Sequence, residues 1–193
     1  MDTALSMAKK IIALSTPINE AAFHRLAEML VRHEYKKGEM ILSEGQVSTE
    51  IGFVYKGLVR QFYYKNKRDV TEHMAMDGKM FFCIESFLRQ HPSYLLVEAV
   101  ENSIIYGLPY GPFMRLCEDD NDVEKMYRHL LEDSLILSQR KADFIRFETA
   151  NERYARLLRE YPEIVRRAPL AYIASFLQMT PETLSRVRAN LSE

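Results

Sequence analysis

The stretch Leu170–Ala189 reads LAYIASFLQMTPETLSRVRA and restricts the fold more than any other part of the sequence. Its apolar residues are spaced as two short, steeply crossing helices require, with the small Ala174 where the helices approach each other. Thr180 followed by Pro181 is a cap with proline at the first helical position, so a second helix begins there. The pattern predicts a helix-turn-helix, although Gln178 stands where glycine is usual; an ordinary helical hairpin is the alternative. The apolar positions are Ile173, Leu177, Met179, Leu184 and Val187.

A long helix precedes this motif. Residues 121–147 carry apolar side chains around a face too wide for a helix that lies on a single surface. We therefore expect two partners: a β unit on one side and the same helix of a second subunit on the other. Thr149 and Glu152 have the capping-box spacing that begins a new helix, which places a domain boundary there. The apolar residues are Val123, Met126, Tyr127, Leu130, Leu131, Leu135, Ile136, Leu137, Phe144 and Ile145.

Short strands and turns occupy about residues 34–110. Turn signals seven to twelve residues apart separate β-branched and aromatic runs such as Ile51–Tyr55 and Leu58–Tyr64. Tyr94–Val100 and Ser103–Leu108 supply the last strands. This spacing predicts an antiparallel sandwich or barrel.

The N-terminal region gives a helix and no targeting segment. Apolar residues from Pro17 to Val31 recur at three- and four-residue spacing, which predicts a helix with Asn19 as its cap. Before it, only the four apolar residues 11–14 follow two lysines, with no small-residue cleavage site. Nowhere do about 18 apolar residues run uninterrupted. We therefore expect a cytoplasmic protein that is neither exported nor membrane-spanning.

Composition and charge exclude several classes of protein. With 193 residues, 47% of them hydrophobic, and only 7 Gly and 7 Pro, the chain is neither disordered nor collagen-like. Residues 1–137 hold 16 basic and 20 acidic residues (net −4), whereas residues 138–193 hold 10 and 7 (net +3), which indicates a basic C-terminal module for a polyanion. The cysteines Cys83 and Cys117 and the five histidines lack metal-ligand spacing, so no metal or cofactor is expected. No phosphate loop, nucleophile elbow or catalytic His–acid pair is present, so we do not expect an enzyme.

The second helix of the motif carries groups that can read DNA. If it enters the major groove, residues near its N-terminus face the base edges. Glu182 can accept from a cytosine amino group and Arg186 can donate a fork to guanine, while Arg188 lies further along, where phosphate is the expected contact. Glu182 could instead be a first-turn acid that complements the helix dipole. The predicted base-edge set is Thr180, Pro181, Glu182, Ser185 and Arg186.

The order of these parts resembles the bacterial Crp/Fnr family of transcription regulators, over nearly the whole chain. In the β unit the resemblance rests on Lys37–Gly45 and Phe53–Val59, which are similar to the family's turn-strand-turn signature. At the C-terminus it rests on Glu152–Ala155 and Thr180–Arg186, the more specific pair.

The resemblance implies an α+β protein: a homodimeric transcription regulator that binds double-stranded DNA, with RNA polymerase as a further partner. Its parts would be a cyclic-nucleotide-binding-like antiparallel β-roll, a cupin-like jelly roll, as sensor at residues 1–120, a dimerisation helix at 121–148 and a helix-turn-helix DNA-binding domain at 149–193. Glu182 and Arg186 match the family's base-reading Glu and Arg, whereas Pro181 replaces the usual Arg, so one base contact is missing.

A competing hypothesis is a non-catalytic ligand-binding or protein-interaction module whose helix-turn-helix does not read DNA. It is favoured by the end of the sequence at Glu193, without the β-hairpin wing that many relatives use against phosphate. Fewer phosphate contacts would give weaker DNA binding.

The sensor lacks the groups with which this family holds a cyclic nucleotide. Phe82 and Cys83 stand at its Gly-Glu positions, Ser93 and Tyr94 stand at its Arg-Ser positions, and Arg89 falls in the intervening turn. We therefore expect no cyclic AMP binding of the usual kind. The aromatic residues either wall a pocket for an unknown small-molecule effector or fill the roll as plain core, with Cys83 a buried small hydrophobe. The candidate pocket residues are Phe81, Phe82, Cys83, Glu85, Ser93, Tyr94, Ser138 and Gln139.

Overall fold

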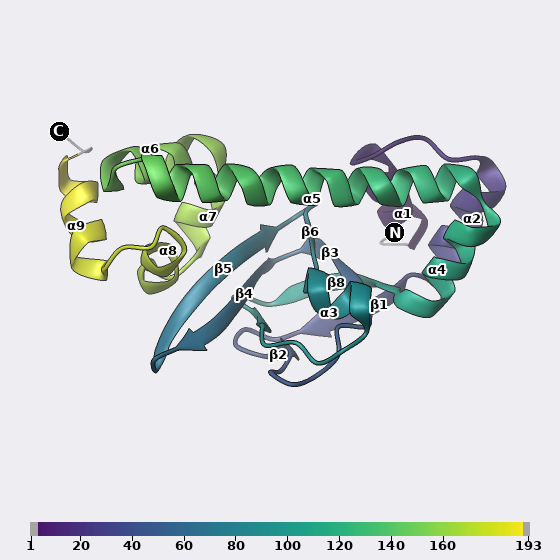
Figure 1. Ribbon diagram of the computed structural model, residues 1–193, viewed down its shortest axis with the longest axis horizontal. Coiled ribbons are helices and arrows are strands. Elements are labelled where there is room, and N and C mark those ends of the chain that lie inside the picture. The colour runs from purple at the N-terminus through teal and green to yellow at the C-terminus, as the bar shows by residue number, and fades with distance from the viewer. Residues whose placement is uncertain (1–3, 191–193) are drawn as a thin grey trace.

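The computed structural model describes residues 4–190 and consists of a β-roll, a long helix above it and a helical C-terminal unit (Figure 1). Its strands are β1 (Val31–Tyr35), β2 (Met40–Leu42), β3 (Glu50–Lys56), β4 (Leu58–Lys65), β5 (Arg68–Met76), β6 (Met80–Phe81), β7 (Leu96–Ala99) and β8 (Ser103–Pro109). Its helices are α1 (Ala4–Ala13), α2 (Glu20–Met29), α3 (Ile84–Arg89), α4 (Tyr110–Asp119), α5 (Asn121–Phe147), α6 (Ala150–Glu160), α7 (Pro162–Arg167), α8 (Leu170–Phe176) and α9 (Pro181–Asn190).

Two four-stranded antiparallel sheets form the roll. Their strand orders are β1-β8-β3-β6 and β2-β7-β4-β5. Val54, Val59, Phe81 and Ile105 fill the space between them, each no more than 6% exposed. Because side chains alternate along a strand, Val59 points inward and its neighbours on β4 point outward. The predicted α+β class with an antiparallel jelly roll is confirmed.

The helix α5 has 27 residues, a length of about 40 Å, and lies along the roll (Figure 1). Val123, Met126 and Leu130 in its N-terminal half are no more than 3% exposed and pack in one cluster with sheet residues such as Phe53. Further along the helix, Leu135 is 70% exposed. Residues of α1, α2 and α4 and of the sheet therefore cover the N-terminal half of α5 together, and an apolar surface further along the helix is left uncovered.

The N-terminal region differs from the sequence-based prediction at two points. The amphipathic helix α1 was not predicted, yet it buries Met7 and Ile11 completely. The helix capped by Asn19, whose side chain accepts from the Ala22 amide at 2.9 Å, ends at Met29 and does not reach Val31. Val31 begins β1 instead, since backbone pairing with β8 outweighs the helical apolar pattern.

The C-terminal unit has its helices where the sequence places them. Thr149 and Glu152 form the complete predicted capping box at the start of α6. Gln178, between α8 and α9, has φ of +52°, the left-handed conformation that explains why glycine is usual at this turn. The residues that pack α8 and α9 together, each no more than 5% exposed, are Ile173, Ala174, Leu177, Leu184 and Val187.

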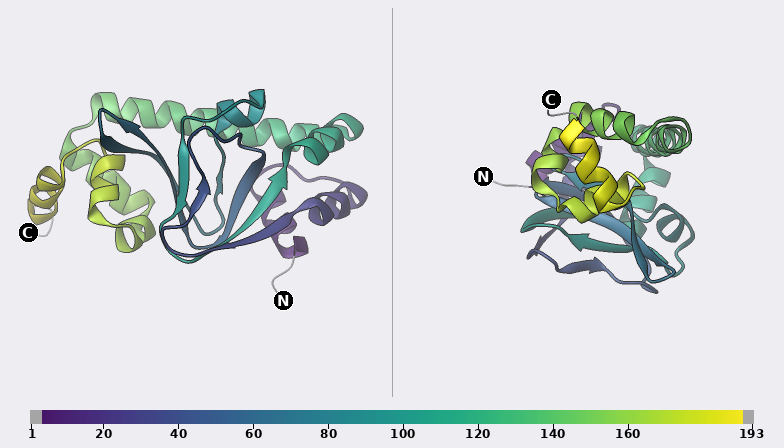
Figure 2. Two further views of the ribbon diagram at one scale, coloured as in Figure 1. Left: turned by 90° about the horizontal axis from the view of Figure 1, so that it is seen from below. Right: turned by 90° about the vertical axis from the view of Figure 1, so that its left-hand side faces the viewer.

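This C-terminal unit packs against the roll. Its apolar core continues into Leu58 of β4, Met74 of β5 and Val100, the residue after β7. Figure 2 shows the unit at one end of the molecule, beside the β4–β5 hairpin. Within residues 4–190, no helix has the length and apolar character needed to cross a membrane.

Candidate functional site

The helix α9 presents one polar face to solvent. Leu184 and Val187 anchor its other face in the core, at 1% and 5% exposure. The spacing of these two anchors leaves the residues between and before them exposed, as a helix that enters a groove requires. The exposed residues include the whole predicted DNA-reading set, Thr180, Pro181, Glu182, Ser185, Arg186 and Arg188.

The first turn of α9 is locally ordered. The Thr183 amide donates to Thr180 Oγ1 at 3.2 Å, which satisfies one free amide of the helix start. Hydrogen bonds from its own amide and from the Thr180 side chain, with the charge of Arg186, lower the pKa of Glu182. Glu182 is thus a carboxylate at neutral pH and can only accept hydrogen bonds, a state that suits both the base-reading role and the first-turn role.

Arg60 of β4 joins the roll to the C-terminal unit. Its side chain is 2% exposed; Nη1 and Nη2 donate to the two carboxylate oxygens of Asp69 at 2.6 and 2.7 Å, and Nε donates to Glu98 at 2.9 Å. Its guanidinium carbon also lies 4.0 Å from the ring centroid of Phe62 and 3.6 Å from that of Tyr172, on α8. A buried guanidinium with both carboxylates in place is a rigid attachment point for α8.

A second contact lies about one helical turn further along α8, at Ser175. The Thr71 amide donates to Ser175 Oγ at 2.8 Å, and that hydroxyl donates to the Asp69 carbonyl at 3.1 Å. Strand β5 is thereby hydrogen-bonded directly to the first helix of the helix-turn-helix pattern.

Charged pairs complete the attachment at two further places. Arg167 of α7 pairs with Glu101 and Asp77 of the roll, and these hydrogen bonds raise the pKa of Arg167 above its ordinary value. Lys141 of α5 pairs with Glu72 of β5 at 2.7 Å. Separate ion pairs therefore join the roll to α5 and to the helical C-terminal unit.

A cleft of about 1200 Å³ lies where these three parts meet. Its walls come from β5, β6 and α3, from the middle of α5 and from α6 to α8, and most of its surface is apolar. Arg153 of α6 lines it, with Nη1 donating to the Leu177 carbonyl at 2.6 Å; its Nε is buried and has no hydrogen-bond partner among residues 4–190. The cleft can hold a mostly apolar molecule with a few polar groups.

The structure brings most of the predicted effector residues to this cleft. Seven of the eight line it, and the exception is Gln139, which donates to Asp143 at 3.3 Å on its own helix. Phe81 and Phe82 are 6% and 7% exposed and also belong to the core of the roll. These two residues thus belong both to the cleft wall and to the core, so the two alternatives are compatible. The lining members of the set are Phe81, Phe82, Cys83, Glu85, Ser93, Tyr94 and Ser138.

The polar groups closest to the positions at which the family binds a cyclic nucleotide already have partners within the chain. Ser93 Oγ donates to the Leu95 carbonyl at 3.1 Å and accepts from its amide at 3.0 Å. Arg89 is the last residue of α3 and lies 4.0 Å from Glu85, so its predicted place in a turn is wrong. Helical spacing explains the difference, because four residues along a helix bring the two charges to one face.

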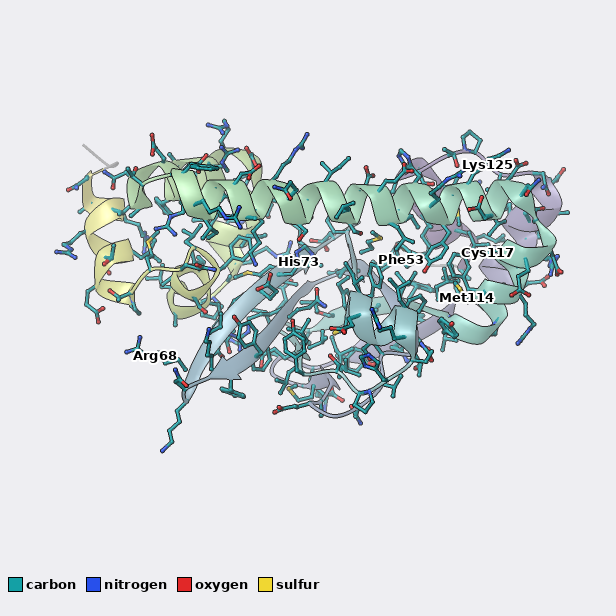
Figure 3. The ribbon with its side chains drawn as sticks, viewed as in Figure 1. Phe53, Arg68, His73, Met114, Cys117 and Lys125 are labelled. Atoms are coloured by element: carbon teal, nitrogen blue, oxygen red, sulfur yellow. The ribbon has the colours of Figure 1, made fainter. Side chains whose placement is uncertain are left out.

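Two titratable groups in the cleft are held neutral. Burial, with the charge of Lys141, lowers the pKa of His73 to about 4, so this ring on β5 beneath α5 is uncharged at neutral pH (Figure 3). Burial raises the pKa of the Cys83 thiol, which fits its interpretation as a buried small hydrophobe. Among residues 4–190 no group of three or more His, Cys, Asp or Glu side chains could hold a metal ion.

The comparisons with known proteins agree with this architecture. Residues 32–120 match the family model of the cyclic nucleotide-binding domain. The fold is similar to FixK2 from Bradyrhizobium japonicum, with a TM-score of 0.70 and 22% identity over 84% of each chain. No curated protein sequence is significantly similar to this chain.

Two solved structures from Thermus thermophilus share the fold as well. A transcriptional regulator of the Crp/Fnr family gives a TM-score of 0.63 at 20% identity, over 84% of this chain and 86% of that one. The catabolite activator protein gives a TM-score of 0.58 at 20% identity, over 95% of this chain and 86% of that one. At such identities the likeness establishes a shared fold.

Proposed function

We propose that this chain is a homodimeric, DNA-binding transcription regulator of the Crp/Fnr type. The observation that carries the proposal is α9, whose polar face is exposed over the whole predicted reading set while its apolar face is anchored in a unit attached to the roll. The solved structures with this fold include a catabolite activator and a Crp/Fnr transcriptional regulator, which supports the same function here.

The second subunit is proposed to bind along α5. Leu131, Leu135, Ser138, Ala142 and Ile145 follow the alternating four- and three-residue spacing of a coiled-coil seam. Because this seam includes the highly exposed Leu135, a matching helix from a second copy would cover apolar surface that one chain leaves in water.

The cleft is proposed as the effector site. It borders both the roll and the helix-turn-helix unit, so a ligand there contacts both parts whose relative position sets the spacing of two α9 helices in a dimer. RNA polymerase would be a further partner of such a regulator.

Cyclic AMP is not expected to be that ligand. The Ser93 hydroxyl is used by the backbone and Glu85 is paired with Arg89, so no free Arg-Ser pair awaits a phosphate. Calorimetric titration of the protein with cyclic AMP should give no saturable heat at micromolar ligand. A clear saturable signal would show that this interpretation of the cleft is wrong.

Two arginine substitutions test how DNA is read. Arg186→Ala should remove a forked contact to guanine, costing about 1 to 3 kcal/mol at one base pair per half-site and relaxing preference there. Arg188→Ala should weaken all sequences about equally and lower the salt slope by roughly one unit for each phosphate that the variant no longer binds. Selection of bound fragments from random DNA, followed by salt titration, separates the two effects.

The proposed dimer also predicts the spacing between the two half-sites of the selected DNA. Two α9 helices in successive major grooves predict half-sites centred about 34 Å apart. If Arg186→Ala stays folded and keeps its sequence preference, the proposed docking is wrong. If the unaltered protein selects no DNA at all, the competing hypothesis of a protein-interaction module is favoured.

A further inference from the structure

The tip of the β4–β5 hairpin is an exposed basic surface. Lys65, Lys67 and Arg68 carry three positive charges within four residues, and each of them is exposed. None of the three is ion-paired with another described residue of the chain. The neighbouring acid, Asp69, is bound by Arg60, so the tip keeps its full positive charge.

The turn that carries these charges has a strained backbone. Asn66 and Lys67 have φ of +52° and +63°, the two left-handed positions of a two-residue hairpin turn in which Lys65 pairs with Arg68. Glycine is favoured at the second position, yet this chain places a lysine there. A strained lysine at a surface turn points to a functional use of its charge.

The hairpin is fixed beside the helix-turn-helix. The contacts of Ser175 to Thr71 and Asp69 hold β5 against α8, and Arg68 directly precedes Asp69. Arg68 and Lys67 lie one and two residues beyond Asp69, about 3 to 7 Å at about 3.3 Å per residue, and Lys65 pairs with Arg68 across the turn. Figure 3 shows Arg68 at the end of the hairpin, on the side of the molecule that holds α8 and α9.

We propose that this hairpin tip contacts DNA phosphates next to the groove that α9 enters. The inference rests on the proposed DNA-binding function and extends it to the sensor roll. Three lysine and arginine side chains on a rigid support near the reading helix form a phosphate-binding surface of the sort that positions a protein on DNA.

DNA is favoured over an acidic protein by position and shape. The tip shares its support, α8, with the reading helix, so a duplex bound by α9 passes close to it. A narrow turn bearing long cations suits a phosphate backbone, whereas a protein interface usually centres on buried aromatic or apolar side chains. A contact with RNA polymerase is therefore the alternative outcome of the test.

The test replaces Lys65, Lys67 and Arg68 together by Gln in the full chain. Its probes are a duplex selected by the unaltered protein and a shuffled duplex of equal length, titrated at several salt concentrations. The slope of log affinity against log salt should fall by about 0.9 unit for each phosphate that the variant no longer binds, or roughly 2 to 5 units for a dimer, on both duplexes. The ratio of affinities between the two duplexes should stay unchanged, because phosphate contacts carry no sequence information.

The matched control replaces three exposed cations at the opposite end of the molecule, Arg25, Lys125 and Arg128, by Gln; Figure 3 shows Lys125 at that end. This variant should keep the slope of the unaltered protein. A hairpin variant that is folded and also keeps that slope overturns the proposal and leaves DNA binding by α9 standing. Loss of transcription activation without any change in DNA binding overturns it in favour of RNA polymerase. Failure of the unaltered protein to bind either duplex overturns the proposal together with the function on which it rests.

Discussion

Replacing Arg60 by Met should lower the free energy of unfolding by about 3 to 5 kcal/mol, since one partner of a buried ion pair is removed. The methionine fills similar space but leaves the carboxylates of Asp69 and Glu98 without their donor. Glu98 is 13% exposed, so water can compensate little of that loss. The variant would also lack the stacking of the guanidinium on Tyr172, which weakens the attachment of α8 to the roll.

Urea unfolding followed by circular dichroism measures this effect. The control is the variant that also carries Asp69→Asn and Glu98→Gln, because neutral partners need no counter-charge and should recover part of the stability. Arg60→Lys should fall between the two, since one ammonium keeps the charge and loses the fork. A loss below about 1 kcal/mol for Arg60→Met would contradict the role of this residue as a buried attachment point.

The fold follows from local patterns where those patterns are long. The capping box at Thr149 and the 27-residue apolar face of α5 depend on residues close together in the sequence, and both were placed correctly. Helix α1 has only ten residues, and Val31 fits a helical pattern equally well as a strand. Whether these residues are helical or extended is decided by tertiary contacts, which a single sequence does not reveal. Helix α1 packs into the core, and Val31 pairs with β8.

The attachment of the C-terminal helical unit to the roll could not be predicted from the sequence either, because it also depends on tertiary contacts. Thr71 and Ser175 are 104 residues apart, and no spacing rule connects them. In the sequence, Arg60 looks like any outward-facing charged residue of a strand. Only the folded structure shows that Tyr172 of α8 packs over its guanidinium. The candidate effector residues could be named because the resemblance to Crp/Fnr regulators marks their positions. Arg153 and His73, which line the same cleft, carry no such mark.

Replacing Leu135 by Asp should convert the proposed dimer into a folded monomer. Leu135 is 70% exposed in the single chain, so the substitution removes few contacts within it, whereas in the proposed seam the carboxylate would be buried against an apolar helix. Leu130 is a poor choice for this test, because it is only 3% exposed within its own subunit. Leu130→Asp would unfold the chain and so would not show whether the protein is a dimer. Multi-angle light scattering at micromolar concentration distinguishes dimer from monomer, and circular dichroism confirms folding.

The same variant should lose most of its affinity for DNA. A dimer that holds two half-sites gains about 10²- to 10⁴-fold over one α9 alone, because the second contact becomes intramolecular. The matched control is Phe147→Asp, also an apolar-to-acid change at a residue that is 79% exposed. Phe147 lies two residues past Ile145 and so about 200° around the helix from the seam, where a second α5 would not reach it. That control should remain dimeric and bind DNA as the unaltered protein does. Equal affinity of Leu135→Asp and the unaltered protein for a two-half-site duplex would show that α5 is not the surface that pairs the two reading helices.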